Sequence, residues 1–395
     1  MSLEPGSRGP VVAARLAPGL LLSMGFLNLI GQAARLLPAW PVLREWPRPE
    51  VQFRLQLGEV PYDLLQAADA ILAPEAVTLL VTPGLDVRGL EYTTFHRALY
   101  FLSPRPVWWL TPAPPDLTWE SRWWISAPFT AEAVLTVAAE KGAPCILVSD
   151  PALELPVGIR VAAWQQGYLL ELGGSGQCLR DSPQAGGADG FAGPLWPLQL
   201  ATALAVIFLT GHALLAAIYS GTTDPSGIER AAQTWAFGAG AVSLLTLYLN
   251  AAGLSLEQQK IVLATLAGVW GVIALARRTK LRRPLPTSSS VALPQSAPIL
   301  RRTLLWALTL LLIIQSGLVI VSALGRPLYV WDSWVNWGVK ARTIFLEGHI
   351  SPAVYADPSR AVTLPDYPLH VPLLEAWLYG WLGAPDDRFA GLITP

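Results

Sequence analysis

Charged side chains are scarce in this chain of 395 residues. Asp, Glu, Lys and Arg together make up 14% of it, whereas hydrophobic residues make up 52%. Ordinary soluble domains carry about 25% charged residues, so the shortage indicates a membrane protein. The formal net charge is only −1. This excludes a broad positive field for nucleic acid, and we expect no nucleic-acid partner.

Cysteine motifs and phosphate-binding glycine motifs are also missing. The two cysteines, Cys145 and Cys178, form no C-x-x-C pair and show no Cys/His spacing of a zinc site, so we predict no metal centre on them. No G-x-G-x-x-G follows a predicted strand. The glycines at 173–176 precede no predicted helix, which argues against a nucleotide site there. The sequence therefore requires no cofactor.

Tryptophan and long apolar runs, by contrast, are plentiful. The 17 tryptophans suit the aromatic belts at the two membrane surfaces. A membrane-spanning helix needs about 20 mainly apolar residues. The run at 17–38 predicts a first span or an uncleaved signal anchor, after a cytoplasmic N-terminus at 1–16. The later runs predict three spans within 196–276, at 196–219, 234–254 and 258–276, and two more at 303–324 and 367–383.

Residues 45–193 have the pattern of a separate domain outside the membrane. Short β-type runs alternate with helical patterns, which predicts an α/β fold with a mostly parallel sheet. The clearest helix is Ala131–Lys141, with Thr130 as its N-cap and Gly142 as its stop signal. A Gly/Pro/Ala-rich linker follows at 183–194. The predicted strands are 77–81, 107–110, 123–125, 145–148 and 161–164, and the other predicted helices are 62–72 and 90–101.

The linker at 277–302 determines the predicted topology. It carries seven basic residues and no acidic one, so the positive-inside rule places it in the cytoplasm. Counting spans from this linker places the α/β domain and the loop at 325–366 outside the cytoplasm, in a multi-pass protein of the plasma membrane. A disulfide between Cys145 and Cys178 is permitted in that compartment.

An ionisable cluster follows the predicted span at 303–324. Asp332 stands between Trp331 and Trp334 and opens a predicted interfacial helix at 333–346. Ionisable groups at a membrane surface are candidates for a functional site. Asp332 has two interpretations, as the N-cap of that helix or as a catalytic carboxylate.

Two further groups of side chains belong to the same stretch. Lys340 and Arg342 lie on the predicted helix, and they could either contact a phosphate or extend to the interface as ordinary surface cations. Asp366, Tyr367 and His370 open the following apolar run. Because Asp366 and His370 are four residues apart, they share a helical face. They could bind substrate or a divalent cation, although two ligands alone do not make a metal site.

Residues 329–390 resemble the first catalytic loop of GT-C-type membrane glycosyltransferases, which include the protein-mannosyltransferase-like and aminoarabinose-transferase-like families. In that pattern an aspartate follows a span, interfacial helices come next, and an aromatic-Pro motif opens the following span. Asp332, the helix at 333–346 and the motif Asp366-Tyr367-Pro368 match these positions. The resemblance implies a GT-C-like polytopic α-helical membrane protein of about six spans, with the α/β domain inserted outside the cytoplasm.

The resemblance also implies a reaction at the lipid bilayer. Members transfer a sugar from a polyprenyl-phosphate donor to an acceptor outside the cytoplasm, which here would be an unidentified glycan, lipid or protein. Asp332 would be the general base, and Lys340 and Arg342 would bind the donor phosphate. The other side chains of the cluster would bind substrate: Trp331, Trp334, Asp366, Tyr367 and His370.

Two alternatives to an active enzyme stay open. The first is a non-catalytic membrane protein whose exported α/β domain binds a ligand or a partner. The second is an inactive front part of a longer glycosyltransferase. The segment at 384–388 has the pattern of a short cytoplasmic turn, and 389–395 resembles the start of a further helix, so we expect more spans after it. A transporter is disfavoured, because the sequence shows no internal repeat.

Overall fold

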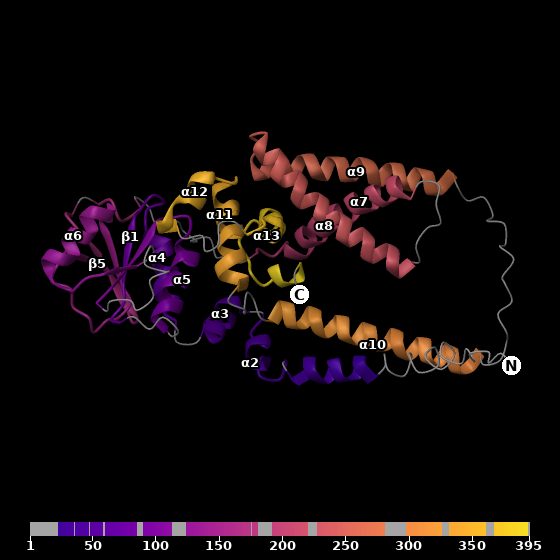
Figure 1. Cartoon of the computed structure of the whole chain (residues 1–395), viewed down its shortest axis with the longest axis horizontal. Helices are drawn as coiled ribbons and strands as arrows, with labels where there is room; N and C mark the ends of the chain where they lie inside the picture. The colour runs from indigo at the N-terminus through magenta and orange to yellow at the C-terminus, as the bar shows by residue number, and fades with distance from the viewer. Residues whose placement is uncertain are drawn as a thin grey trace, which may run out of the picture.

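The chain divides into an α/β part and a long-helix part, which occupy opposite ends of the molecule (Figure 1). Helices α11, α12 and α13 lie between them. The computed structural model describes residues 23–34, 36–46, 48–57, 60–84, 90–112, 124–174, 176–180, 192–219, 227–280, 298–325, 332–360 and 367–393.

One mixed sheet of six strands forms the α/β part, in the order β3-β2-β1-β4-β6-β5. The first four strands in that order run parallel, whereas β6 pairs antiparallel with both β4 and β5. The strands are β1 (Thr78–Val81), β2 (Val107–Thr111), β3 (Trp124–Ser126), β4 (Cys145–Val148), β5 (Ile159–Trp164) and β6 (Gly167–Glu171). The helices packed around them are α4 (Tyr62–Ile71), α5 (Leu90–Leu102) and α6 (Ala131–Lys141). Two helices precede these in the chain, α2 (Trp40–Leu43) and α3 (Pro49–Leu57).

The sheet is covered on both faces. Leu80 packs into the apolar cluster that α4 and α5 share, whereas Leu79 and Val81 pack into the cluster on the α6 side. Strands buried on both faces have continuous apolar runs. Five of the strands were predicted to within about two residues, and continuous apolar runs explain this for the buried strands β1, β2 and β4. Strand β6 was not predicted, because its five residues begin with a glycine and follow β5 after a two-residue turn.

Helix α6 ends where the sequence predicts. The Thr130 hydroxyl accepts a hydrogen bond from the Ala133 amide at 3.3 Å, which caps one of the unpaired N–H groups of the first turn. At the other end Gly142 adopts a φ of 59°, in the left-handed region where a side chain would be unfavourable. These signals are local, so the sequence alone determines them.

Three helices of the long-helix part are long and apolar enough to cross a membrane, among the residues that the structure describes. They lie at Trp196–Ile218, Leu256–Ala276 and Arg302–Leu324. They belong to α7 (Trp196–Ile218), α9 (Leu256–Lys280) and α10 (Pro298–Gly325). The protein is thus a candidate multi-pass membrane protein.

The other predicted spans form shorter or less apolar helices. Residues 234–254 lie mainly in α8 (Gly227–Ala251), which is not among the three candidates. The first predicted span contains a helix at 23–34, which runs beside α10 (Figure 1). The Gln315 side chain of α10 donates a hydrogen bond to the Gly25 carbonyl of this helix at 2.6 Å. Helix α13 (His370–Leu382) has 13 residues, fewer than the about 20 that a span needs.

Two glycines bring α7 and α8 into direct backbone contact. A Cβ at Gly211 would lie 1.9 Å from the Thr234 carbonyl oxygen, and a Cβ at Gly238 would lie 2.1 Å from the Ile207 carbonyl oxygen. Helices pack this closely only where small residues face each other, as membrane helices commonly do. The two helices therefore form one rigid pair against which α13 packs.

The disulfide permitted by the sequence is formed between Cys145, at the start of β4, and Cys178, after β6. It closes a loop with a sequence separation of 33 residues. For a loop of that size, removal of the bridge is expected to lower the free energy of unfolding by about 3–4 kcal/mol. We expect Cys145→Ser/Cys178→Ser to lower the melting temperature, and a reducing agent to lower that of the wild type to the same value. Equal melting of oxidised and reduced wild type would contradict this.

The close approach of α7 and α8 leads to a second expectation. Gly211→Ala should force the two helices apart and destabilise the detergent-solubilised protein by about 1–3 kcal/mol, the usual cost of overpacking. Gly240→Ala is the matched control on α8, because a Cβ there would meet no atom within 4 Å. Thermal unfolding of both variants tests this. If the two substitutions have equal effects, the backbone contact does not hold the pair together.

Candidate functional site

Asp332 begins the helical segment that follows the candidate span in α10. The segment comprises the π-helix η2 (Ser333–Gly338) and α11 (Val339–Glu347), so a helix forms where one was predicted at 333–346. Asp332 is exposed, and its carboxylate accepts a hydrogen bond from the Asn336 amide at 2.9 Å. Its side chain makes no capping hydrogen bond to the helix. The carboxylate is therefore held by a side chain and remains open to solvent.

Trp334 lies in the interface between this segment and the α/β part. Its side chain is buried, and the Arg97 guanidinium of α5 lies 3.7 Å from the centre of its ring. The centres of the His96 and Trp334 rings lie 6.5 Å apart. A cation stacked on a desolvated indole is worth about 2 kcal/mol. Trp334 thus joins the helical segment to α5.

Lys340 and Arg342 point to different sides of α11. Residues two apart on an α-helix lie about 200° apart around the axis, since each residue turns about 100°. The Lys340 ammonium is buried and lies 5.8 Å from the centre of the Tyr367 ring. Arg342 instead faces the α/β part, where it pairs with Asp69 of α4 at 3.5 Å. The structure does not bring the two cations together.

The beginning of α13 lies beside the Lys340 flank of α11. The exposed Tyr367 ring lies 5.6 Å from the Trp337 ring, so an aromatic pair covers the buried lysine. His370, also exposed, shares a 2.6 Å hydrogen bond with the Ser243 hydroxyl of α8. Lys340 and Tyr367 are therefore neighbours, whereas His370 is held by a different helix.

Two of the residues predicted for the site, Trp331 and Asp366, lie outside the described part of the chain. Among the residues that the structure does describe, no group of three or more His, Cys, Asp or Glu side chains could hold a metal ion.

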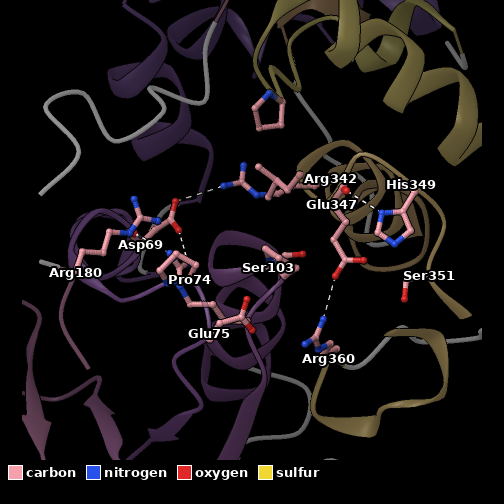
Figure 2. A pocket seen from close by; sticks show the side chains of 14 residues that line it. Asp69, Pro74, Glu75, Ser103, Arg180, Arg342, Glu347, His349, Ser351 and Arg360 are labelled. Carbon is pink, nitrogen blue, oxygen red and sulfur yellow. Dashed lines mark hydrogen bonds and ion pairs between the residues drawn. The ribbon is translucent and has the colours of Figure 1, made fainter. Parts of the chain in front are cut away.

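A cavity of about 630 Å³ opens between the α/β part and the segment α11–α12, where α12 is Pro352–Ala356 (Figure 2). Arg342 is the one residue of the predicted site among its lining residues. The other charged or ionisable side chains around it were not predicted: Asp69, Glu75, Arg105, Arg180, Glu347, His349 and Arg360. They come from α4, from the loops around β1, β2 and β6, from the end of α11 and from the short helix η3 (Pro358–Arg360), so no local pattern of the sequence links them.

The arginines of this cavity are held by ion pairs and backbone carbonyls. Asp69 accepts from Arg105 at 2.5 Å and pairs with Arg342, while Glu347 pairs with Arg360 at 3.0 Å. Burial raises the pKa of Glu347, and the nearby Arg360 opposes that shift. Four arginines face three carboxylates. The cavity is therefore polar, with a small excess of positive charge.

A second polar cluster lies next to Arg342 and contains a buried carboxylate. The Asp387 carboxylate accepts hydrogen bonds from the Tyr100 hydroxyl of α5 and, at 2.7 Å, from the Tyr379 hydroxyl of α13. Burial is the main cause that raises the pKa of Asp387 to about 6. The Arg342 guanidinium carbon lies 5.3 Å from the centre of the Tyr100 ring. The cluster connects α5, α11 and α13.

This cluster corrects the prediction for residues 384–388. A cytoplasmic turn would lie across the membrane from the α/β domain, but Asp387 is in hydrogen-bond contact with Tyr100 of that domain. The neighbouring Asp386 accepts from the Ala192 amide at 2.8 Å and pairs with Arg388. All three charged side chains of the turn are buried. The charges resembled a solvated turn because sequence does not show which distant groups neutralise them.

The arrangement offers two chemically distinct surfaces. One is the flank with Asp332 and Tyr367, where an exposed carboxylate and an exposed aromatic ring are available. The other is the arginine-lined cavity on the opposite side of α11, which suits a polar or anionic group. No family model, no curated protein and no solved structure matches the chain.

The raised pKa of Asp387 predicts a pH dependence of stability. The pKa rises from an ordinary 3.8 to about 6, so the folded state binds this proton more tightly than the unfolded state. The free energy of unfolding should therefore fall by about 3 kcal/mol as the pH rises from about 4 to above 6. Asp387→Asn should abolish this part of the slope in urea unfolding at several pH values. Glu140→Gln on the exposed face of α6 is the control, and an unchanged slope in Asp387→Asn would refute the assignment.

Proposed function

We propose that this chain is a membrane glycosyltransferase that takes a sugar from a polyprenyl-phosphate donor and uses Asp332 as its general base. The observation that carries the proposal is the placement of Asp332. It is an exposed carboxylate at the start of the helical segment that follows a candidate span, and Asn336 orients it. A base for a membrane-bound donor must be open to the acceptor and close to the lipid surface.

The proposed reaction follows from what an oriented carboxylate can do. Asp332 accepts the proton of an acceptor hydroxyl, and the acceptor oxygen forms a bond to the anomeric carbon of the sugar. The bond from that carbon to the phosphate oxygen breaks, and polyprenyl phosphate leaves with the electron pair. Attack from the side opposite the phosphate inverts the configuration of the anomeric carbon.

The departing phosphate needs a cation, and α11 offers one on each flank. Lys340 lies on the side of Tyr367, and Arg342 lies on the side of the polar cavity. A guanidinium can bind two phosphate oxygens at once, whereas an ammonium acts as a compact charge. The base and the departing phosphate act on one carbon atom, so they must lie on the same side of α11. Arg342 lines the cavity on the side opposite Asp332, and we therefore assign the donor phosphate to Lys340 in preference to Arg342.

The remaining residues of the predicted site have supporting roles in this proposal. Tyr367 and Trp337 present an aromatic pair on the flank of Lys340, and such rings suit the C–H faces of a sugar. The tyrosine is 41% exposed, so a substrate could contact it. Trp334 acts indirectly, because it holds the helical segment against α5. His370, Trp331 and Asp366 remain candidates for substrate binding.

Substitution of the proposed base tests the function. In membranes that carry matched amounts of protein, Asp332→Asn should reduce transfer of labelled sugar from polyprenyl-phosphate donors by about 100-fold or more, the usual contribution of a general base. Its melting temperature should stay within a few degrees of the wild type, because the side chain is exposed. Asn336→Ala should reduce transfer less, since it removes only the group that orients the carboxylate.

The control is Glu140→Gln, which removes an exposed carboxylate on α6, far from Asp332 in the sequence. Equal transfer by Asp332→Asn and the wild type would exclude Asp332 as the base. Absence of transfer by the wild type, over a broad panel of donors and acceptors, would favour a non-catalytic membrane protein.

A further inference from the structure

The order of the strands identifies a second place where a ligand could bind, at the carboxyl ends of β1 and β4. From β1 the chain moves outward to β2 and β3, and then returns to β4 on the other side of β1. The connections thus diverge between β1 and β4, which are parallel neighbours. In open α/β sheets, ligands bind outside the carboxyl ends of the strands at such a switch point.

A cavity of about 210 Å³ lies at this point. Pro83 follows the carboxyl end of β1, and Ser149 and Pro151 follow the carboxyl end of β4. Leu90 and Thr94, from the first two turns of α5, form another wall. The cavity was not predicted, because the glycine pattern that usually marks such a site is missing from the sequence.

We propose that this cavity binds a small neutral ligand with several hydroxyl groups, of the size of a single sugar ring. Among the residues that the structure describes, the lining carries no ionisable side chain, so none of these residues compensates a charged ligand. Proline and leucine side chains provide apolar walls for C–H groups. Thr94, Ser149 and Gln166 provide hydrogen-bonding groups at separate positions around the ligand.

The hydrogen bonds within the site define which groups a ligand can use. The Gln166 side-chain oxygen accepts from the Leu64 amide at 3.3 Å, so its NH₂ group remains a donor. The Ser149 hydroxyl donates to the Val81 carbonyl at 3.2 Å, so its oxygen remains an acceptor. A donor beside an acceptor matches the hydroxyl groups of a sugar, each of which can both donate and accept.

This site is independent of the proposed transferase reaction, because none of its lining residues belongs to the flank of Asp332 or to the arginine-lined cavity. The α/β part would then recognise a sugar by itself, whether or not the rest of the chain transfers one.

Binding can be measured by saturation-transfer difference NMR on the full chain in nanodiscs. The probes are glucose, galactose, mannose and N-acetylglucosamine, with glucose 6-phosphate and glucuronate as charged counterparts of the same ring. We expect saturable binding of at least one neutral sugar and about tenfold weaker binding of the charged probes. Asp332→Asn should bind the sugar as the wild type does, which separates this result from failure of the transferase proposal.

Two variants locate the binding. Ser149→Leu fills the cavity and should abolish binding, while Thr94→Val keeps the side-chain shape and should weaken it by about two- to tenfold, the value of one hydrogen bond. Thr94→Val keeps the test valid if Ser149→Leu fails to fold. Arg360→Gln, in the other cavity, is the control. No saturable binding of any neutral sugar, stronger binding of a charged probe, or full binding by both variants would overturn the proposal.

Discussion

The buried carboxylate of Asp387 is the contact on which the arrangement of the two halves depends. It accepts hydrogen bonds from Tyr100 of the α/β part and from Tyr379 of α13. Tyr100 and Asp387 are 287 residues apart in the sequence. A buried carboxylate without partners is very costly, so the two hydroxyls must stay in place. This requirement fixes α5 relative to α13. The segment with Asp332 is packed between these two helices, so its position follows from the same contact.

Local patterns made much of the fold predictable. Strands buried on both faces have continuous apolar runs, and the caps of α6 are determined by Thr130 and Gly142 alone. The helical segment after Asp332 could also be predicted from a local pattern, because its tryptophans recur at helical spacing. The apolar runs also predicted α7, α9 and α10. What length alone could not show is that the run at 367–383 forms a short buried helix, because that depends on the neighbours it packs against.

The candidate site was less predictable, since its chemistry depends on pairs that are distant in sequence. Lys340 and Arg342 are near neighbours in sequence, yet one faces Tyr367 and the other faces Asp69. The arginines of the cavity and the acidic pair before Arg388 come from separate segments, and each has a common, solvated interpretation when taken alone. Only the fold shows that opposite charges neutralise them. Asp332 could be named as a candidate from the sequence because its signal, a carboxylate shortly after an apolar run, is local.

The distance in sequence between Tyr100 and Asp387 has a consequence for biosynthesis. The α/β part is complete by residue 180, and domains generally fold as units while the chain is still being made. Some 200 further residues must be added before Asp387 emerges, which takes about 10–40 s at usual rates of translation. During that interval Tyr100, Arg97 and Asp69 are uncovered on a folded domain that awaits its partner surface. During this period a face of the α/β part that is buried in the finished protein is exposed to water. Because this face carries polar and charged side chains, it can stay soluble until the rest of the chain covers it.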